Sequence, residues 1–358
     1  MPQKEAPHAC ADAAGLVYVS DSGPGIGRRR CGKGFCYLAA SGKQLRDVPT
    51  IKRIKALAIP PAWTEVWICS DPHGHIQATG RDQRGRKQYR YHPLWTDIRK
   101  DSKFSGLVAF ARSLPGLRRR VELDLRRRGM PRERVIASIV WLLDKSLIRI
   151  GNDAYAQENR TFGLTTLRSR HLKVEGDSLR FAFVGKSGRE WRLRLNHRRV
   201  AAVIRTIQEL PGQRLFQYVD VDGKRRDIHS QDVNDYIRGV LGDDFTSKHF
   251  RTWGATVAAA HLLAGTAVPR SPRERAKVLN GAVDVIAKLL RNTRAVCRSG
   301  YIHPAVPEAW SECRLAAEMK VAANRSRRHR KGLAMNEAVV LKWLSTLATG
   351  ADLHSRDG

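Results

Sequence analysis

The chain has 358 residues, and its 65 Lys and Arg against 34 Asp and Glu give a formal net charge of +31 at pH 7. A field of that sign favours a strongly anionic partner, and nucleic acid is the first candidate. With 42% hydrophobic residues and 8 Trp, the chain has material for packed cores and is not a disordered polybasic segment. No apolar run has the length of a signal peptide or a membrane span, so we expect a cytoplasmic protein with no membrane partner.

The cysteines and glycines offer two cofactor sites, and we expect neither to form. The 6 cysteines include no C-x-x-C pair and no His cluster completes a zinc site, so reduced thiols and no metal are predicted. GRRRCGKG (27–34) is close to the phosphate loop G-x-x-x-x-G-K-[ST], but Gly34 replaces the hydroxyl that would hold magnesium. The residues after it are typical of a strand. We therefore predict a hairpin turn with surface arginines there, and no nucleotide cofactor.

The N-terminal part of the sequence is rich in short β-type runs. Residues 1–14 are expected to be a flexible tail. From residue 15 onward, runs such as GFCYLAASGK and EVWICSDPHGHIQATG alternate with turn residues, and a single helical stretch, TIKRIKALA, ends at IPPAW. We therefore predict a small strand-rich DNA-binding domain over residues 15–97.

Beyond residue 97 the apolar residues recur mainly at helical spacing, first in IRKDSKFSGLVAFARSL and then in PRERVIASIVWLLDKSLIRIG. LRFAFVGKSGREWRLRL breaks the pattern with two alternating strands around a Gly-Lys-Ser-Gly turn, which is typical of a β-hairpin. Helices are predicted again in HRRVAAVIRTIQEL, SQDVNDYIRGVLG, TWGATVAAAHLLAG, RERAKVLNGAVDVIAKLL and PEAWSECRLAAEMKVAAN. The prediction is a mainly α domain over residues 98–323 with an embedded hairpin, and an α+β fold for the whole chain.

Residues 324–358 are predicted to form a basic linker, NRSRRHRKG, followed by a C-terminal helix. Two roles are compatible with their composition. They can be an additional segment that grips DNA, or a tail that only keeps the protein soluble.

The segment GRDQRGRKQYRYH (80–92) interleaves cations with aromatic rings. Its cations are suited to phosphates, and its tyrosines offer ring faces and hydroxyls to sugars and bases. A solvated basic loop is the alternative, but the interleaved tyrosines favour DNA binding. The residues concerned are Arg81, Arg84, Arg86, Lys87, Tyr89, Arg90 and Tyr91.

Four further stretches carry residues suited to phosphodiester chemistry: IRIGNDAY, FVGKSG, SKHFRTW and LLRNTRAVCRSGYIHP. Each alone has an ordinary structural explanation, such as a cation at a helix end or an aromatic in a core. Together they supply a nucleophilic oxygen, fixed positive charge around a phosphorus atom and an acid for the leaving alkoxide. The candidate catalytic residues are Arg149, Lys186, Lys248, Arg251, Asn292 and Tyr301.

The order of these motifs resembles the type IB DNA topoisomerases, in particular the short poxvirus-like branch found in bacteria. GRDQRGRKQYRYHP, RIGNDAYAQEN, TFGLTTLRSRH, FVGKSG, FRTWGAT and the spacing from Asn292 to Tyr301 occur in family order. The resemblance implies an enzyme of the bacterial nucleoid that relaxes supercoiled duplex DNA by transient cleavage of one strand, strand rotation and religation. It implies no cofactor, neither ATP nor metal, and a monomer that closes its two domains as a clamp around the DNA.

The resemblance also implies a role for each catalytic residue. Tyr301 is the nucleophile that forms a 3′-phosphotyrosyl bond, while Arg149 and Arg251 clamp the phosphate oxygens. Lys186 is the general acid that protonates the 5′ oxygen, and Lys248 supports it.

One catalytic position departs from the family pattern. Asn292 stands where many members have His, and both side chains can donate one hydrogen bond to a phosphate oxygen. Because Asn does not titrate near neutrality, this position should contribute no pH dependence. Further DNA contacts are implied at Gln88, Tyr89, Tyr91, Tyr155 and Asn159.

Two other classes fit parts of the pattern. A tyrosine recombinase or integrase uses the same chemistry in a related fold, but usually has H-x-x-R where this chain has KHFR (248–251), and lacks the GRDQRGRKQYRYH segment. A non-catalytic basic DNA-binding protein would bind DNA without forming a covalent adduct.

Two other residues of the segment SKHFRTW are given supporting roles. We interpret His249 as a surface or supporting residue, and Trp253 as packing that fixes Arg251.

Overall fold

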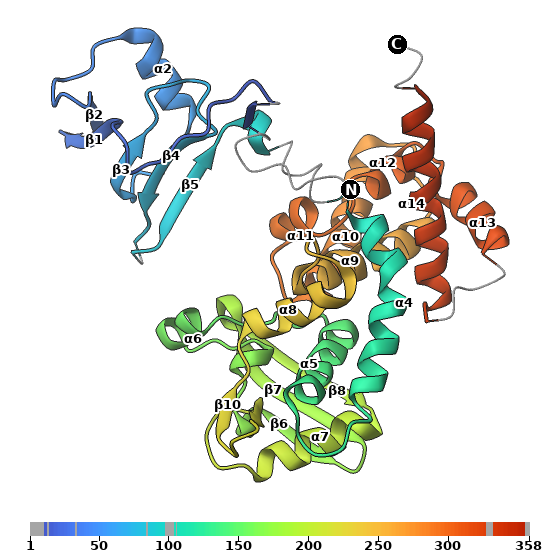
Figure 1. Cartoon of the computed structure of the whole chain (residues 1–358). Helices are drawn as coiled ribbons and strands as arrows, with labels where there is room; N and C mark the ends of the chain where they lie inside the picture. Colours follow the sequence, from blue (N-terminus) through green and yellow to red (C-terminus); the bar gives the residue numbers. More distant parts are fainter. Residues whose placement is uncertain are drawn as a thin grey trace. The chain divides into compact units, whose positions relative to one another are not determined.

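The chain divides into two compact units, Met1–Lys103 and Phe104–Gly358. Figure 1 shows a unit built on a sheet and a unit built mainly of helices, so the fold class is α+β as predicted. Both are seen in a computed structural model. It describes residues 11–12, 14–32, 34–83, 85–96, 104, 106–326 and 332–354.

A five-stranded antiparallel sheet forms the first unit, with strand order β2-β1-β3-β4-β5. The segment that is close to a phosphate loop forms the hairpin of β1 and β2, as predicted. β5 is an edge strand, which leaves one side of its backbone without a partner strand. The strands are β1 (Ile26–Cys31), β2 (Gly34–Leu38), β3 (Thr64–Ile68), β4 (Ile76–Arg81) and β5 (Lys87–Tyr91).

The helix α2 (Val48–Ala56) covers this sheet. The Asp47 side chain begins the helix by accepting a hydrogen bond from the Thr50 N–H at 2.9 Å. Ile54 is buried in the same apolar cluster as Ile26 and Ile68 of the strands. The small core of the first unit is therefore closed by one short amphipathic helix.

Helices dominate the second unit. None of the helices in the described part of the chain is both long and apolar enough to cross a membrane. The helices are α4 (Leu107–Asp124), α5 (Arg132–Ser146), α6 (Asp153–Asn159), α7 (Arg198–Glu209), α8 (Ser230–Leu241), α9 (Ser247–Ala264), α10 (Pro272–Leu290), α11 (Arg294–Gly300), α12 (Ala305–Ser311), α13 (Leu315–Arg325) and α14 (Met335–His354).

The predicted hairpin is present as β7 (Ser178–Gly185) and β8 (Arg189–Asn196), paired from Ser178–Asn196 to Gly185–Arg189. A third strand, β6 (Leu172–Glu175), pairs with β7 and was not predicted. Along β7 buried and exposed residues alternate, so one face of this sheet packs into the core. A further small sheet of β9 (Gln217–Val219) and β10 (Arg225–Asp227) was also missed, because each strand has only three residues.

Two helix boundaries differ from the prediction. α4 continues through Pro115, whose ring removes one helical hydrogen bond, because the apolar face of the helix is fully buried on both sides of it. The single helix predicted from residue 307 to 324 is instead α12 and α13. The break falls at Cys313, whose φ of 61° lies in the left-handed region that ends a helix.

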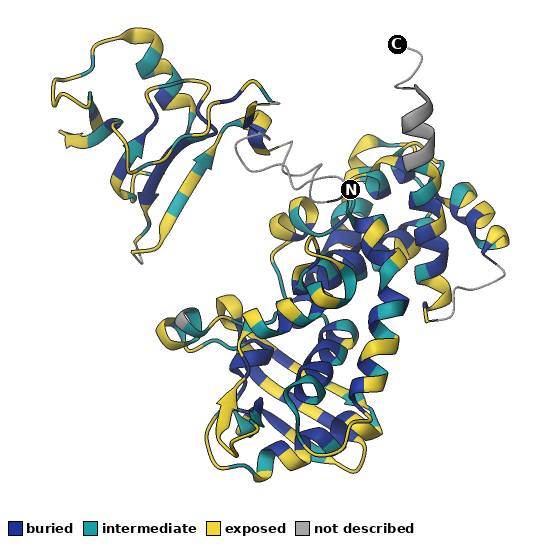
Figure 2. Cartoon of the chain, in the orientation of Figure 1, coloured by how far each residue is buried: buried dark blue, intermediate teal, exposed yellow. Residues whose placement is uncertain are grey.

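The helix α9 lies at the centre of the second unit. Figure 2 shows that most of its surface is buried, and it contacts helices on every side, including α4, α5, α10 and α14. Its alanine-rich sequence permits this, because small side chains let several helices approach one axis closely. Trp253 is 2% exposed, as expected for a packing residue.

The C-terminal helix α14 is part of the core. Val340, Trp343 and Leu344 are buried in the same cluster as the residues of α4 and α9, so the helix is neither a solubilising tail nor a free DNA-binding one. The two roles predicted for residues 324–358, a segment that grips DNA or a tail that only keeps the protein soluble, were wrong for α14, because the apolar residues of this helix pack into the core. Most of the predicted basic linker, residues 327–331, lies outside the described residues.

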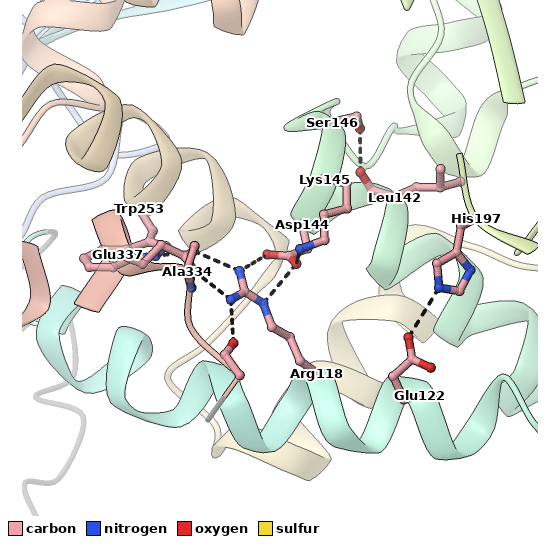
Figure 3. Close-up of polar contacts among 11 residues, drawn as sticks. Arg118, Glu122, Leu142, Asp144, Lys145, Ser146, His197, Trp253, Ala334 and Glu337 are labelled. Atoms are coloured by element: carbon pink, nitrogen blue, oxygen red, sulfur yellow. Dashed lines mark hydrogen bonds and ion pairs between the residues drawn. The ribbon is translucent and has the colours of Figure 1, made fainter. Parts of the chain in front are cut away.

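A buried ion-pair network ties α14 to the rest of the unit (Figure 3). The Arg118 guanidinium on α4 donates to both carboxylate oxygens of Glu337 on α14 and of Asp144 on α5, at 2.7–3.0 Å. Glu337 also accepts a hydrogen bond from the indole N–H of Trp253 at 3.1 Å. Burial opposes the charge on Arg118, but the two carboxylates outweigh it and raise the pKa of this side chain. Four helices therefore share one charged junction.

Replacing Glu337 by Gln should destabilise the second unit by about 3 kcal/mol, because it leaves a buried guanidinium short of one counter-charge. Urea unfolding of the purified chain measures this change. The matched control is Glu312→Gln, which breaks an exposed pair with Arg314 and should leave the free energy of unfolding almost unchanged. Equal effects of the two substitutions would contradict the proposed importance of the junction.

Candidate active site

Arg251 lies in the second turn of α9 and is only 3% exposed. Its guanidinium donates hydrogen bonds to the backbone carbonyls of Leu147 and Leu290, the latter at 2.9 Å. Leu147 follows the last residue of α5 and Leu290 is the last residue of α10, so both acceptors lie at the negative ends of helix dipoles. Burial and the nearby charge of Arg149 lower the pKa of Arg251 to about 10, so it stays protonated at neutral pH.

Arg149 follows α5 in a segment held by close backbone contacts. The Leu164 N–H donates to the Arg149 carbonyl at 2.9 Å. A side chain at Gly163 would meet the Gly151 backbone at 2.5 Å, so this approach requires glycine. The Arg149 guanidinium donates to Oδ1 of Asn292. The Nδ2 amide is therefore the group that Asn292 has left to donate.

Tyr301 directly follows α11, and α9 fixes its backbone. The Thr256 hydroxyl on α9 donates to the Tyr301 carbonyl at 3.2 Å and accepts from the His303 N–H at 3.1 Å. The Arg251 guanidinium carbon lies 5.1 Å from the centre of the Tyr301 ring. Burial alone would raise the pKa of Tyr301, but the positive charges of Arg251 and Arg149, with Asn292, outweigh it and lower this pKa.

Lys186 lies at the tip of the β7–β8 hairpin. Ser187 after it has φ 63°, so the turn projects the lysine on the exposed side of the sheet. Its Nζ lies 5.4 Å from the centre of the Tyr155 ring, a cation–π distance. The ring therefore restricts where the ammonium group can go.

These side chains surround one cavity of about 430 Å³. Five of the six predicted catalytic residues line it. The sixth, Asn292, borders it, because it accepts a hydrogen bond from Arg149, which lines the cavity. Three buried polar atoms here have no hydrogen-bond partner in the described part of the chain: Arg251 Nε, Asn292 Nδ2 and Thr161 Oγ1. The lining residues are Arg149, Ile150, Gly151, Asn152, Tyr155, Thr161, Phe162, Gly163, Lys186, Ser247, Lys248, Arg251 and Tyr301.

Sequence reasoning missed Thr161 and Phe162, which line the cavity. The glycine after them, Gly163, was the only local sign that this segment approaches another backbone. Tyr155 lines the cavity as well, but Asn159 does not. The Asn159 amide donates to the Tyr155 carbonyl at 3.2 Å, so it supports α6 instead.

His249 is not a surface residue. Its Nδ1 accepts a hydrogen bond from the Thr246 N–H at 3.1 Å, at the start of α9, and its ring packs against Phe110 and Phe245. It therefore supports the helix that carries Arg251. Lys248 beside it is exposed and faces the cavity.

In the first unit, several of the predicted DNA-binding residues have partners within the protein. Arg81 pairs with Glu65, and Arg86 and Gln88 both donate to Asp82. A further cation, Arg90, donates to a backbone carbonyl at 3.0 Å. Arg84 lies outside the described residues.

A stripe of exposed residues remains on one face of the edge strand β5. Lys87, Tyr89 and Tyr91 alternate with inward residues, and the two tyrosine rings stack with centres 5.7 Å apart. Both rings are about two-fifths exposed, at 42% and 41%. Lys87 keeps its ammonium 5.7 Å from the Tyr89 ring while it pairs with Asp21. Flat rings beside a cation suit a nucleic-acid surface.

Metal ligands do not cluster in the part of the chain that the structure describes. Among those residues, no three side chains of His, Cys, Asp or Glu gather where they could hold an ion.

The mainly helical unit, which follows a strand-rich one, carries a cationic cavity with a half-buried phenol, an arrangement suited to a protein that acts on a nucleic-acid backbone. Residues 95–326 match the family described as "Eukaryotic DNA topoisomerase I, catalytic core", and residues 34–82 match "Bacterial DNA topoisomerase IB, N-terminal domain". The chain belongs to the type IB DNA topoisomerases, which are isomerases that act on DNA.

Individual relatives agree with this assignment. The chain is 33% identical over 285 residues to "DNA topoisomerase 1B" of Acanthamoeba polyphaga mimivirus, covering 78% of this chain and 85% of the viral protein. It is 23% identical over 144 residues to "DNA topoisomerase 1B" of Vaccinia virus (strain Copenhagen), covering 39% and 46%. "DNA topoisomerase 1" of Mycosarcoma maydis is 26% identical over 168 residues, 42% of this chain and 16% of that protein.

Gly254→Ala tests the contact that sets Arg251. An added Cβ would lie 2.7 Å from a Leu147 methyl, so the Leu147 side chain must turn away or α9 must move, and either change loosens the packing beside a carbonyl that receives Arg251. We expect a loss of about 1–3 kcal/mol in the free energy of unfolding, together with slower DNA cleavage. Gly281→Ala is the control: it lies in α10 with open space around it and should stabilise by about 0.5–1 kcal/mol. A neutral Gly254→Ala would show that this packing is not tight.

Proposed function

We propose that the chain relaxes supercoiled duplex DNA by cutting one strand through Tyr301, letting it rotate and resealing it, without ATP or a metal ion. The observation that supports this is one cavity in which a half-buried phenol meets fixed cations and unsatisfied donors. A buried N–H without an acceptor costs about 1–3 kcal/mol. A phosphate oxygen between Arg251 Nε and Asn292 Nδ2 would satisfy both groups.

Cleavage is a transesterification that balances without a co-reactant. The Tyr301 oxygen attacks the phosphorus, the bond from phosphorus to the 5′ oxygen breaks, and a 3′-phosphotyrosyl ester forms. The phenol proton leaves to water, and Lys186 gives a proton to the departing 5′ oxygen. Resealing is the reverse step. Because the ester keeps the energy of the broken bond, neither ATP nor another energy source is needed.

The cations divide the work by their surroundings. Arg251 gives one N–H of each terminal nitrogen to a carbonyl, and its Nε has no partner among the described residues, so Nε is a rigid donor open to the phosphate. Arg149 fixes the Asn292 amide and adds its own charge. Lys186 in the hairpin turn and Lys248 in the first turn of α9 are both exposed and line the cavity, and the leaving strand would start beside Lys186. Rigid donors on the phosphorus side favour the transition state, because they need no reorganisation.

A single copy of the chain would suffice for this reaction. Every group in the proposed mechanism lines or borders one cavity of one chain. The stripe of Lys87, Tyr89 and Tyr91 would add a second, sequence-tolerant contact to the DNA from the first unit. We therefore propose a monomer as the active species.

Tyr301→Phe should abolish relaxation of a supercoiled plasmid in EDTA without ATP, because it removes only the attacking oxygen. The wild-type chain should relax the plasmid in steps and leave a detergent-stable adduct on Tyr301, seen by mass spectrometry. Tyr218→Phe is the matched control, since it removes a hydroxyl from a partly buried tyrosine that does not line the cavity, and it should leave relaxation unchanged. Wild-type relaxation that needs magnesium or ATP, or an adduct on another residue, would contradict the proposal.

The rising limb of the cleavage rate with pH should report Tyr301. Its pKa is lowered from 10.0 by nearby charges, so the phenolate forms at lower pH than in free tyrosine. Arg149→Gln removes one of those charges, so the pKa should rise and the midpoint should move to higher pH. The pH profile of kcat/KM measures this for the free enzyme. Arg119→Gln, an exposed arginine on α4, should leave the midpoint in place; an equal shift would contradict the assignment.

A further inference from the structure

A second depression, of about 640 Å³, lies next to the active site and has no role in the proposed chemistry. Phe162 lines both spaces, so they adjoin. Three arginines form the rim of this depression, and its floor is apolar. The rim residues are Arg160, Arg168 and Arg170, and the floor includes Phe162, Ala182 and Val184.

The three rim arginines differ from the other arginines nearby in having no internal counter-charge. Arg180 pairs with Glu175 on the same sheet, and Arg214 pairs with Asp153. No ion pair or side-chain hydrogen bond is found for the guanidinium of any rim arginine among the described residues. Arg168 contacts only the Phe162 ring, at 5.7 Å from its centre. Three uncompensated charges around one depression favour an anion with several negative groups.

The backbone holds these arginines in place. Arg160 ends α6 with φ 49°, in the left-handed region where glycine is usual and other residues cost about 1 kcal/mol. The N–H of Arg168 donates to the buried ring of His171 at 3.1 Å. The main chain is therefore fixed at two of the three rim positions, Arg160 and Arg168.

The depression lies in the direction that a cleaved strand would take. Ala182 and Val184 alternate with buried residues and so point to the exposed face of β7, and Lys186, also exposed, follows the strand by one residue. At about 3.3 Å per residue, Val184 is about 7 Å and Ala182 about 13 Å from Lys186 along the strand. A DNA strand that begins at Lys186 would reach the rim arginines within a few nucleotides.

We infer that Arg160, Arg168 and Arg170 bind backbone phosphates of the DNA strand that begins with the freed 5′ hydroxyl. The inference rests on the proposed function, because Lys186 marks the start of that strand only if it is the acid. The arginines would hold the free strand loosely near Tyr301 between cleavage and resealing. They are positioning residues, since they touch the substrate away from the reacting atoms.

Religation by an isolated adduct tests this directly. Acceptor strands that carry a 5′ hydroxyl are added in two lengths, one that ends near Lys186 and one that extends over the depression. For Arg160→Gln/Arg168→Gln/Arg170→Gln we expect the KM of the long acceptor to rise roughly 10- to 100-fold. The kcat for resealing, and both constants for the short acceptor, should stay unchanged.

The control variant is Arg119→Gln/Arg126→Gln/Arg128→Gln, which removes the same charge from exposed positions on and after α4 that line neither space. It should leave both acceptors unaffected. A rim variant that weakens both acceptors equally, or neither, overturns the inference.

Duplex binding provides a readout that does not depend on chemistry. The slope of log affinity against log salt should fall by about 0.7–0.9 for each phosphate that the rim variant no longer neutralises, and should not fall in the control. Equal slopes for the rim variant and the wild-type chain overturn the inference even if no adduct can be made. Absence of the Tyr301 adduct from the wild-type chain would instead overturn the proposed function.

Discussion

The buried guanidinium of Arg251 is the constraint that organises the second unit. A buried cation usually needs a carboxylate, but here the carbonyls at the ends of α5 and α10 accept its hydrogen bonds. Helix ends carry only partial negative charge, so most of the positive field remains. A carboxylate would have neutralised that field. The arrangement therefore keeps a cation inside the fold, protonated and still able to attract an anion.

The same helix transmits this constraint in three directions. Two residues after Arg251, Trp253 donates to Glu337 and so joins the junction of Arg118 with α14. Next to it, Gly254 lets the end of α5 approach closely. Two residues after Gly254, Thr256 holds the backbone of Tyr301. Because all these contacts lie on α9, a shift of this helix would move Tyr301, the proposed nucleophile, and Arg251, a proposed phosphate donor, together.

The sequence predicted the features that depend on local chemistry and missed those that depend on distant partners. The β7–β8 hairpin follows from a turn of glycines between alternating residues, and α9 from its apolar spacing. No pattern could show that Arg251 meets the carbonyls of Leu147 and Leu290, because backbone oxygens are the same in every residue. The junction that ties α14 to α4 joins Arg118 and Glu337, which are 219 residues apart in the chain. The prediction that the catalytic candidates lie in one site came from the family resemblance, because their spacing in the chain alone does not show it.

The high positive charge is divided among sites according to what surrounds each cation. Arg118 is fully compensated by two carboxylates and serves the fold. Arg251 is compensated only by dipoles and faces the proposed phosphate. The rim arginines, such as Arg168, have no anionic partner among the described residues, so any attraction they exert is directed outward. In the second unit, the degree of internal compensation therefore separates the structural cation Arg118 from the cations that we propose to meet DNA. Rigid cations lie beside the bond that would be broken, and exposed ones lie where a strand must be free to move.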